Sequence, residues 1–264
     1  MKLRSLLYVP GDNERFIARA HERGADAIII DLEDSVRPER RDGARQALAD
    51  TVQSAGQGGA QVLVRINADP ETSRQDVDAA ARAGADGLYV SKANRARIDS
   101  IAADAPGTAL FALIEDPAAL LDAAAIAGHP SVRGLSVGGE DMATALGADP
   151  DTLRMPKLMV HYAAKAFGKL SLGLFRCIAD YADIAGIETA AQEARRHGFD
   201  GASCIHPSAV PILNAVFSPT PEEIDWARRV LAAAETNEAG AFTVDGRMVD
   251  APIVARARTI LVKS

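Results

Sequence analysis

The sequence predicts an α/β protein built around one (β/α)8 barrel, and a repeated segment is the first reason. The stretches RGADAIIIDLED (23–34), AGADGLYVSKAN (83–94) and HGFDGASCIHPS (197–208) each pass from Gly through Asp into a short apolar run that ends in polar residues. Gly suits the position that follows a helix, and the apolar run is typical of a buried parallel strand. The length of 264 residues also suits one such barrel.

Five further apolar runs complete a set of eight strands, and helix-like segments alternate with them. The runs cover 4–10, 61–67, 109–116, 132–141 and 170–177, and the helical segments include 13–23, 38–54, 73–83, 117–127, 156–168 and 188–197. Eight alternating β and α units favour a barrel. A doubly wound open sheet is the alternative, but the Gly-rich stretch GQGG (56–59) precedes a strand instead of following one, so it is no dinucleotide-binding turn.

The pattern changes after the eighth strand, which divides the chain into a barrel over 1–217 and a C-terminal extension over 218–264. The stretch SPTPEEIDWARRVLAAAET (218–236) predicts one well-capped helix, and AFTVDGRMVDAP (241–252) predicts a hairpin that turns at Asp245 and Gly246. A last helix covers about 252–262. We expect this extension to pack outside the barrel or on a neighbouring subunit.

Composition and charge exclude several classes of function. The formal net charge is −7 and no long Lys/Arg block occurs, which argues against nucleic acid and anionic lipid as partners. Two isolated cysteines in strand-like contexts, Cys177 and Cys204, suggest reduced thiols in a cytoplasmic protein. No apolar run is long enough for a membrane span or a signal-peptide core, so we expect no membrane association.

Polar residues gather where the predicted strands end, which is where such barrels carry their catalytic groups. These residues are Tyr8, Asp31, Glu33, Asp34, Arg65, Asn67, Lys92, Asn94, Glu115, Asp116, Glu140, Asp141 and His206. The ring is mostly acidic, which favours Mg²⁺, or else Mn²⁺, over zinc. Glu115 and Asp141 are the best metal pair because they follow the neighbouring strands five and six. The alternative is that the acids cap the helices that come next.

The basic members of the ring each have two interpretations. Arg65 can bind a substrate carboxylate or an enolate, or it can form a structural ion pair with Glu33. Lys92 can form a Schiff base with a carbonyl substrate, although an ion pair with the acidic ring is the favoured interpretation. In the stretch IIIDLEDSV (28–36), Asp31 is predicted to be structural, and Glu33 and Asp34 to orient Arg65, Lys92 or metal-bound waters.

Several ordered motifs resemble one known family. RSLLYVPGDNERFIARA, GADAIIIDLEDSV, VRIN, ALIEDPAAL, GGEDMATALG, GFDGASCIHPSAVPILNAVFSPT and DGRMVDAP are similar to the HpcH/HpaI aldolase and citrate lyase β subunit family, with its malyl-CoA and citramalyl-CoA lyase relatives. The resemblance runs from Arg4 to about Leu261. It implies a barrel of the phosphoenolpyruvate/pyruvate type, a Mg²⁺ ion and cleavage of a 3-hydroxyacyl thioester.

The resemblance also assigns residues by motif. Glu115 and Asp141 match the metal ligands, and Arg65 matches the substrate-binding arginine. The positions that match substrate or CoA contacts are Tyr8, Arg15, Arg19, Ile205 and His206, although Arg15 and Arg19 also fit a solvated helix face. Asp250 matches an acid that some relatives send into a neighbouring subunit's site, whereas an N-cap for the last helix is its other interpretation. Ser91 departs from the pattern, because relatives commonly have Pro there, and 161–186 is unusual around strand seven.

The predicted function is Mg²⁺-dependent carbon–carbon cleavage of a short 3-hydroxy(di)carboxylyl-CoA thioester of the citramalyl, malyl or citryl type to acetyl-CoA and a 2-keto acid. Arg65, Asp250 and Glu33 are its predicted catalytic residues. Hydrolysis of the same thioester, a Schiff-base aldolase that uses Lys92, and a non-catalytic subunit that binds acyl-CoA or acyl carrier protein are the alternatives. We expect a homotrimer or a hexamer.

Overall fold

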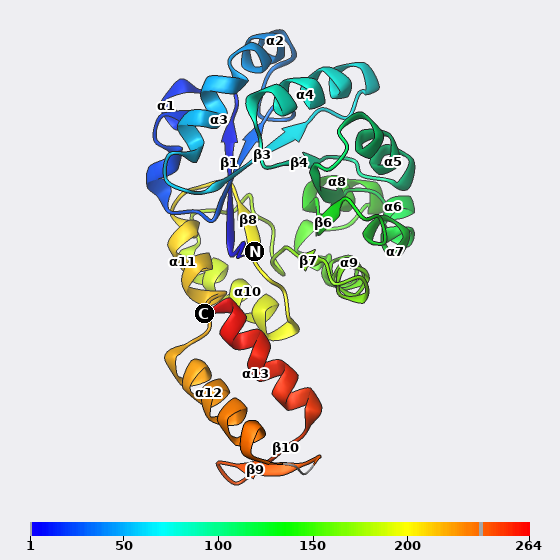
Figure 1. Ribbon diagram of the computed structural model, residues 1–264. Coiled ribbons are helices and arrows are strands. Elements are labelled where there is room, and N and C mark those ends of the chain that lie inside the picture. Colours follow the sequence, from blue (N-terminus) through cyan, green and yellow to red (C-terminus); the bar gives the residue numbers. More distant parts are fainter. Residues whose placement is uncertain (1, 238–239) are drawn as a thin grey trace.

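The computed structural model describes residues 2–237 and 240–264, and it confirms the barrel of eight parallel strands (Figure 1). The strands are β1 (Ser5–Pro10), β2 (Ala27–Asp31), β3 (Gln61–Ile66), β4 (Gly87–Val90), β5 (Ala109–Ile114), β6 (Val132–Val137), β7 (Leu170–Ser171) and β8 (Ala202–Cys204). They pair in sequence order from β1 to β7, and β8 pairs with β1. A parallel bridge between Leu172 and Gly201 joins β7 to β8 and closes the sheet.

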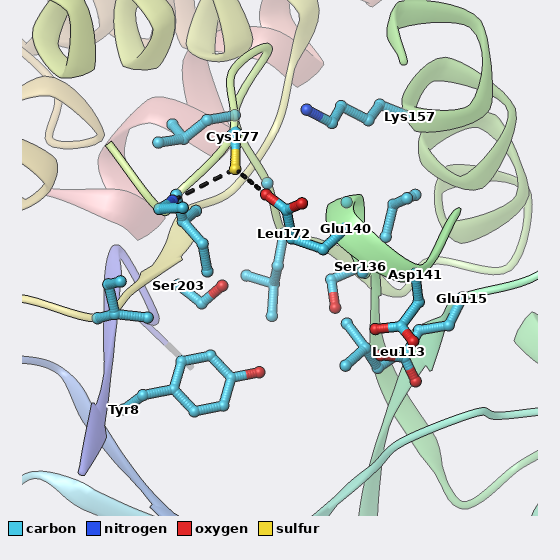
Figure 2. Close-up of a pocket in the computed structure, with 18 of the residues that line it drawn as sticks. Tyr8, Leu113, Glu115, Ser136, Glu140, Asp141, Lys157, Leu172, Cys177 and Ser203 are labelled. Atoms are coloured by element: carbon cyan, nitrogen blue, oxygen red, sulfur yellow. Dashed lines mark hydrogen bonds between the residues drawn. The ribbon is translucent and has the colours of Figure 1, made fainter. Parts of the chain in front are cut away.

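The strand register brings the predicted site residues to one end of the barrel. Asp31 is the partner of Pro10 on β1 and of Arg65 on β3, and Arg65 is in turn the partner of Tyr89 on β4. Because all eight strands are parallel, their carboxyl ends meet at one rim. The cavity drawn in Figure 2 opens at that rim.

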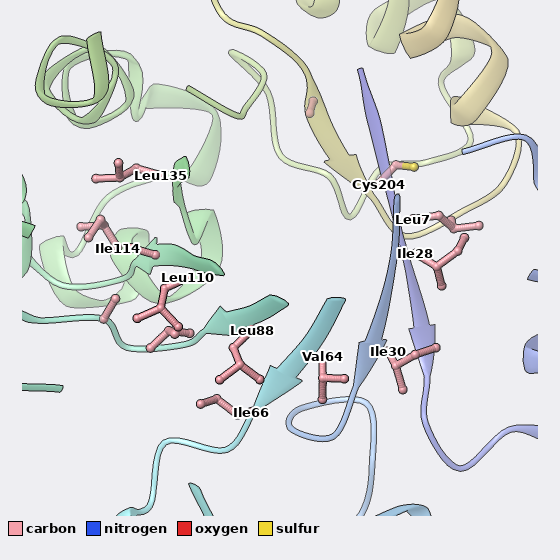
Figure 3. Close-up of a cluster of buried hydrophobic side chains, with 14 of the residues drawn as sticks. Leu7, Ile28, Ile30, Val64, Ile66, Leu88, Leu110, Ile114, Leu135 and Cys204 are labelled. Carbon is pink, nitrogen blue, oxygen red and sulfur yellow. The ribbon is translucent and has the colours of Figure 1, made fainter. Parts of the chain in front are cut away.

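Two layers of apolar side chains explain why the strands are apolar along their whole length. Leu6, Ile29, Leu63, Tyr89 and Phe111 fill the barrel interior. Their neighbours along the strands point outward, under the helices, and ten of these outward residues are labelled in Figure 3: Leu7, Ile28, Ile30, Val64, Ile66, Leu88, Leu110, Ile114, Leu135 and Cys204. Each large aliphatic side chain buried in this way contributes roughly 1.5–3 kcal/mol.

The helices around the sheet differ from the prediction mainly in where they break. They are α1 (Glu14–Ile17), η1 (Ala20–Arg23), α2 (Pro38–Gln46), α3 (Leu48–Gly56), α4 (Pro70–Ala83), α5 (Arg95–Asp104), α6 (Pro117–Leu121), α7 (Ala123–Ala127), α8 (Gly139–Leu146), η2 (Pro150–Thr152), α9 (Arg154–Ala166), α10 (Ile184–His197) and α11 (Ala209–Val216). The segments 13–23, 38–54 and 117–127, each predicted as one helix, are split in two. The last split falls at Asp122, whose ψ of 8° is far from the helical value.

The seventh strand is the largest departure from the prediction. It ends at Ser171 instead of Cys177, and Gly173 follows with a φ of +155°, which favours glycine. Residues 172–183, here the β7–α10 segment, contain no helix and no strand beyond the bridge at Leu172. Cys177 therefore lies in this segment and not in a strand, so its predicted context is wrong.

The C-terminal extension has the predicted helix, hairpin and helix: α12 (Pro221–Thr236), β9 (Phe242–Val244), β10 (Arg247–Val249) and α13 (Ala251–Lys263). Asp245 and Gly246 both have positive φ at the tip of the hairpin, as a type I′ turn requires. The extension projects from the barrel with the hairpin at its far end (Figure 1). It has a small apolar cluster of its own around Ala227 and Val230. Its packing on a neighbouring subunit and the domain boundary at 217/218 stay predictions.

Within residues 2–237 and 240–264, no helix combines the length and the apolar character that a membrane span requires.

Candidate active site

A cavity of about 480 Å³ occupies the carboxyl-end rim of the barrel, and eight of the predicted site residues line it. Of the predicted residues, those that line it are Tyr8, Asp31, Asp34, Arg65, Glu115, Glu140, Asp141 and Ile205. The remaining walls are formed largely by α9 and by the β7–α10 segment. The cavity thus has an acidic side near β2 to β6 and a second side that the sequence did not predict.

Glu115 and Asp141 come together as the strand order requires. Glu115 directly follows β5, Asp141 lies in the first turn of α8 behind β6, and Figure 2 shows the two carboxylates close to each other. Gly138 makes room for this arrangement, because a Cβ atom there would lie 2.5 Å from Glu115 Cγ and 2.7 Å from its Oε1. Any other residue at 138 would push the Glu115 carboxylate away.

The electrostatics of this pair fit a divalent cation. Burial, followed by the charges of Glu33 and Asp141, raises the pKa of Glu115 to about 7, although the backbone N–H of Lys92 donates to it. A hard cation between two carboxylates would remove this repulsion. No cluster of three or more His, Cys, Asp or Glu side chains suited to a metal occurs in the described part of the chain. The pair would therefore leave coordination positions to substrate and water.

Arg65 forms the ion pairs that the sequence left as one of two options, and it still faces the cavity. Its Nε and Nη2 donate to Asp31 at 2.6 Å each, and its Nη1 donates to Asp34 at 2.9 Å. Burial alone would lower the pKa of Arg65, but the hydrogen bonds and charge of Asp31 outweigh it and raise that pKa. One N–H on each terminal nitrogen remains for a substrate. Asp34 is 66% exposed, so a substrate can displace it more easily than Asp31.

Asp31 is the structural acid of the three, as predicted. Besides pairing with Arg65, its two oxygens accept the backbone N–H groups of Glu33 and Ser35 at 2.9 and 3.0 Å. Burial alone would raise the pKa of Asp31, but Arg65 and these donors lower it overall. The carboxylate that follows a buried strand is therefore fully compensated.

Glu33 is less well compensated. Its Oε2 lies 3.1 Å from Arg65 Nη1 but has no well-aligned donor, and burial raises the pKa of Glu33 with a further contribution from Asp34. Glu33 also raises the pKa of Glu115, so it belongs to the same electrostatic cluster. This position fits the predicted role beside Arg65, although Glu33 does not itself line the cavity.

The structure supports neither interpretation of Lys92. Its backbone N–H holds Glu115, but its side chain is exposed and does not line the cavity. Among the ion pairs of the described residues, none involves Lys92. Lys92 has a positive φ of 46°, and its backbone, not its side chain, contacts the Glu115 carboxylate. The Schiff-base hypothesis therefore has no structural support.

Tyr8 and Ile205 line the cavity, whereas the predicted substrate contacts Arg15, Arg19 and His206 lie outside it. The guanidinium of Arg65 stands 5.2 Å from the Tyr8 ring centre, and burial raises the pKa of the Tyr8 hydroxyl. Arg15 and Arg19 are exposed, and Arg19 pairs with Glu22 at 3.0 Å. His206 is exposed too, where it stacks on Tyr181 with 4.9 Å between ring centres.

Asp250 lies at the start of α13, where its side chain accepts the backbone N–H of Ile253 at 3.4 Å. This is the helix-cap interpretation of Asp250. Figure 1 places this end of α13 beside the hairpin and away from the barrel. Asp250 therefore does not reach the cavity of its own chain, and its delivery to a neighbouring subunit stays a prediction.

Lys157, Arg176 and Cys177 are cavity residues that the sequence did not predict. Lys157 projects from α9, and its Nζ donates to the carbonyl of Arg176 at 3.1 Å. The thiol of Cys177 lies 2.7 Å from Oε1 of Glu140, the residue that directly precedes Asp141. A lysine on the buried face of an amphipathic helix was the one available signal.

Comparisons with known proteins identify the family of the chain. The model of the HpcH/HpaI aldolase/citrate lyase family matches residues 4–207. The chain belongs to this family. It is 38% identical to a (3S)-malyl-CoA thioesterase of Cereibacter sphaeroides over 99% of this chain and 94% of that protein. It is 33% identical to the citrate lyase subunit beta of Escherichia coli over 98% of this chain and 92% of that protein.

Among solved family structures, protein CitE from Mycobacterium tuberculosis, in complex with magnesium, acetoacetate and coenzyme A, superimposes with a TM-score of 0.79. It is 33% identical, and the match covers 98% of this chain and 97% of that one. The match extends through the C-terminal extension, so the whole architecture is that of the family.

Proposed function

We propose that the protein cleaves the carbon–carbon bond of a short 3-hydroxy(di)carboxylyl-CoA of the citramalyl, malyl or citryl type, with Mg²⁺ held by Glu115 and Asp141. The observation that carries this proposal is the paired, buried carboxylates at the cavity wall, with Gly138 making room for them. The magnesium and coenzyme A in the CitE complex support it. Mn²⁺ is the alternative ion for the same donors.

In this reaction Glu115 and Asp141 would act, through the ion that they hold, at the hydroxy-acid end of the substrate. Arg65 would act at its thioester end. Bound Mg²⁺ would lower the pKa of the substrate hydroxyl and polarise the adjoining carboxylate. The bond between C2 and C3 breaks, its electron pair passes to the thioester half as an enolate, and the hydroxyl carbon becomes the carbonyl of a 2-keto acid. Arg65 donates its remaining N–H groups to the enolate oxygen, and Asp31 holds the guanidinium in place for this.

The hydroxyl proton requires a base, and we assign it to Asp250 of a neighbouring subunit. Glu33 assists by its position beside Arg65 and Glu115, where its charge adds to the field that the cation neutralises. The enolate then takes up the proton that Asp250 removed from the hydroxyl and leaves as acetyl-CoA. A homotrimer or hexamer would supply Asp250 to each site.

Hydrolysis of the same thioester is the second candidate. The 38% identity to a (3S)-malyl-CoA thioesterase favours it. The substrate and ion would be bound in the same way, with water attacking the thioester carbonyl and Arg65 facing the resulting oxyanion.

One assay separates the two reactions. The purified protein is given malyl-CoA or citramalyl-CoA with Mg²⁺ or with EDTA, and keto acid and free thiol are measured in the same samples. Carbon–carbon cleavage releases keto acid without free thiol, whereas hydrolysis releases free thiol without keto acid. Activity that survives EDTA, or that survives Asp141→Ala, would contradict the metal assignment.

A further inference from the structure

Arg97 on α5 is a half-buried arginine whose side chain binds backbone carbonyls instead of acids. Its Nε donates to the carbonyl of Ser91 at 3.0 Å, its Nη1 to that of Ala68 at 2.9 Å, and its Nη2 to that of Asn67. Among the described residues, no carboxylate lies within ion-pair distance of Arg97. Burial lowers the pKa of Arg97, and more distant acids offset this only in part. Stability alone therefore does not explain an arginine at this position.

The peptide group between Ser91 and Lys92 joins Arg97 to Glu115. Its carbonyl oxygen accepts from Arg97 Nε, and its N–H, which is the backbone N–H of Lys92, donates to Oε2 of Glu115. This peptide is trans, so its C=O and N–H point in opposite directions, with the guanidinium on one side and the carboxylate on the other. Hydrogen bonds in such a chain polarise one another, so a cation at one end strengthens the bond to an anion at the other.

The backbone at this peptide has a conformation that the surrounding structure must enforce. Lys92 has a φ of 46°, a region that residues other than glycine rarely occupy. On one side of it, the buried Ser91 donates its hydroxyl to a carbonyl of β3 at 2.8 Å. On the other side, the N–H of Ala93 donates to a carbonyl of β5 at 3.0 Å. Backbone strain of this kind is found at functional sites, and here it directs one N–H to Glu115.

We propose that Arg97 is a positioning residue for Glu115 and acts through the peptide between Ser91 and Lys92. This rests on the proposed function, in which Glu115 is a ligand of the ion. The bond from Lys92 fixes Oε2 of Glu115, and Oε1 lies on the side of Gly138, where an added Cβ atom would be 2.7 Å from it. Arg97 does not line the cavity, so it supports the ion site without touching the ion or the substrate.

The affinity for Mn²⁺ is the first measurement, made by calorimetry on protein from which metal has been removed. Arg97→Met keeps a long side chain and removes every donor, so the Kd should rise about 10- to 100-fold, the usual effect of losing a residue that orients a metal ligand.

Asp76→Asn is the matched control for the Mn²⁺ titration. Asp76 accepts the N–H and the side-chain amide of Asn67 at 2.8 and 2.7 Å, so it holds the same loop after β3 without contacting the peptide between Ser91 and Lys92. Its Kd should stay close to that of wild type. If Asp76→Asn raises the Kd as much as Arg97→Met, loosening of this loop is the cause and the proposal is wrong.

The amide proton of Lys92 provides a readout that a purely structural role of Arg97 would not change. The chain has six lysines, so ¹⁵N-lysine labelling gives few backbone NMR signals, and Lys92→Arg identifies the signal of Lys92. In wild type without metal, this proton should be shifted downfield, because it donates to a carboxylate and its peptide is polarised by Arg97. It should move upfield in Arg97→Met and stay in place in Asp76→Asn. An unchanged position in Arg97→Met would overturn the proposal.

Arg97→Gln is the second variant if Arg97→Met does not fold. It loses the charge but keeps a polar side chain, so the upfield shift and the higher Kd are still expected, and wild-type values for both would refute the positioning role. Neither measurement depends on turnover. A protein inactive on CoA thioesters that shows both effects would refute the lyase and retain the positioning role. An active lyase in which both values are unchanged would do the opposite.

Discussion

The two sides of the cavity are built in opposite ways. On the β2–β3 side, five registered residue pairs join β1 to β2, and five more join β2 to β3. Arg65 donates two hydrogen bonds to Asp31 there. On the β7 side, the strand has two residues, the amine of Lys157 donates to a backbone carbonyl and not to an acid, and the Nε of Arg176 has no acceptor. On the regular side Arg65 and Asp31 compensate each other within the protein, whereas on the irregular side Lys157 is buried with a backbone carbonyl as its partner.

This difference separates a region that must stay constant from one that can vary. A regular, charge-balanced region holds the groups that all substrates of the family share, because its geometry must stay constant. A loop with unsatisfied donors can change from one family member to another without disturbing the barrel. The following predictions test this contrast, from the largest expected effect to the smallest.

The metal pair lies between the two sides and should have the largest effect. Glu115→Ala or Asp141→Ala should lower kcat/KM by about 1000-fold, or about 4 kcal/mol of transition-state stabilisation, because a ligand of the Mg²⁺ is lost. Steady-state kinetics with a Mg²⁺ titration measure this. Asp116→Ala is the control, since Asp116 caps α6 and does not line the cavity. Equal losses in all three variants would contradict the assignment.

Asp31→Ala should destabilise the protein by about 3–5 kcal/mol, because it leaves the buried guanidinium of Arg65 without its main partner. Asp34→Ala removes an exposed partner of the same arginine and should cost less than about 1 kcal/mol. Urea unfolding of both variants gives the comparison. Similar losses for the two would show that burial does not determine the strength of these pairs.

Glu115 predicts a pH dependence of stability when no metal is bound. Burial raises its pKa from 4.5 to about 7 in the folded state, so the folded protein holds a proton that the unfolded chain has released. The free energy of unfolding should therefore decrease as the pH rises from about 4.5 to 7, by roughly 3 kcal/mol at most. Unfolding curves in EDTA across this range test the sign, and Glu115→Gln should flatten the dependence. An unchanged slope in that variant would assign the effect to other groups.

Lys157→Met should have the smallest effect on stability, within about 1 kcal/mol of wild type. The change removes a buried charge that has no acidic partner among the described residues, so a lost hydrogen bond is offset by relief from desolvation. Urea unfolding beside Asp31→Ala tests the contrast directly. A loss of 3 kcal/mol or more would mean that the β7 side is stabilised by its charges in the same way as the β2–β3 side.

The predictable part of the molecule is the part where local pattern and tertiary structure agree. Strands β1 to β6 follow from apolar runs, and the meeting of Glu115 with Asp141 follows from strand order alone. Arg65 was harder, because residue type does not reveal whether a guanidinium pairs with an acid of its own chain or with a substrate. The structure shows the pair with Asp31, and the substrate contact stays a prediction. The bidentate contact with Asp31 depends on the register between β2 and β3, which no single segment encodes.

The β7 side was not predictable for physical reasons. The apolar run 170–177 has the composition of a strand, but the conformation of Gly173 ends the ladder after Ser171. Lys157 and Arg176 are 19 positions apart and belong to different elements, so only the folded chain reveals that they share a wall. For Asp250 the cap at α13 and a role in another subunit use the same residue, and one chain's sequence cannot distinguish them.

The seam between β7 and β8 has a consequence for how the barrel opens. One bridge, Leu172 with Gly201, and its flanking backbone hydrogen bonds join the two strands, whereas neighbouring strands elsewhere share up to five registered pairs. In hydrogen-exchange experiments the amides of Gly173 and Asp200 should therefore exchange sooner than those of β2. Local opening of the barrel would therefore occur between β7 and β8. The cavity wall that contains Arg176 begins at this junction.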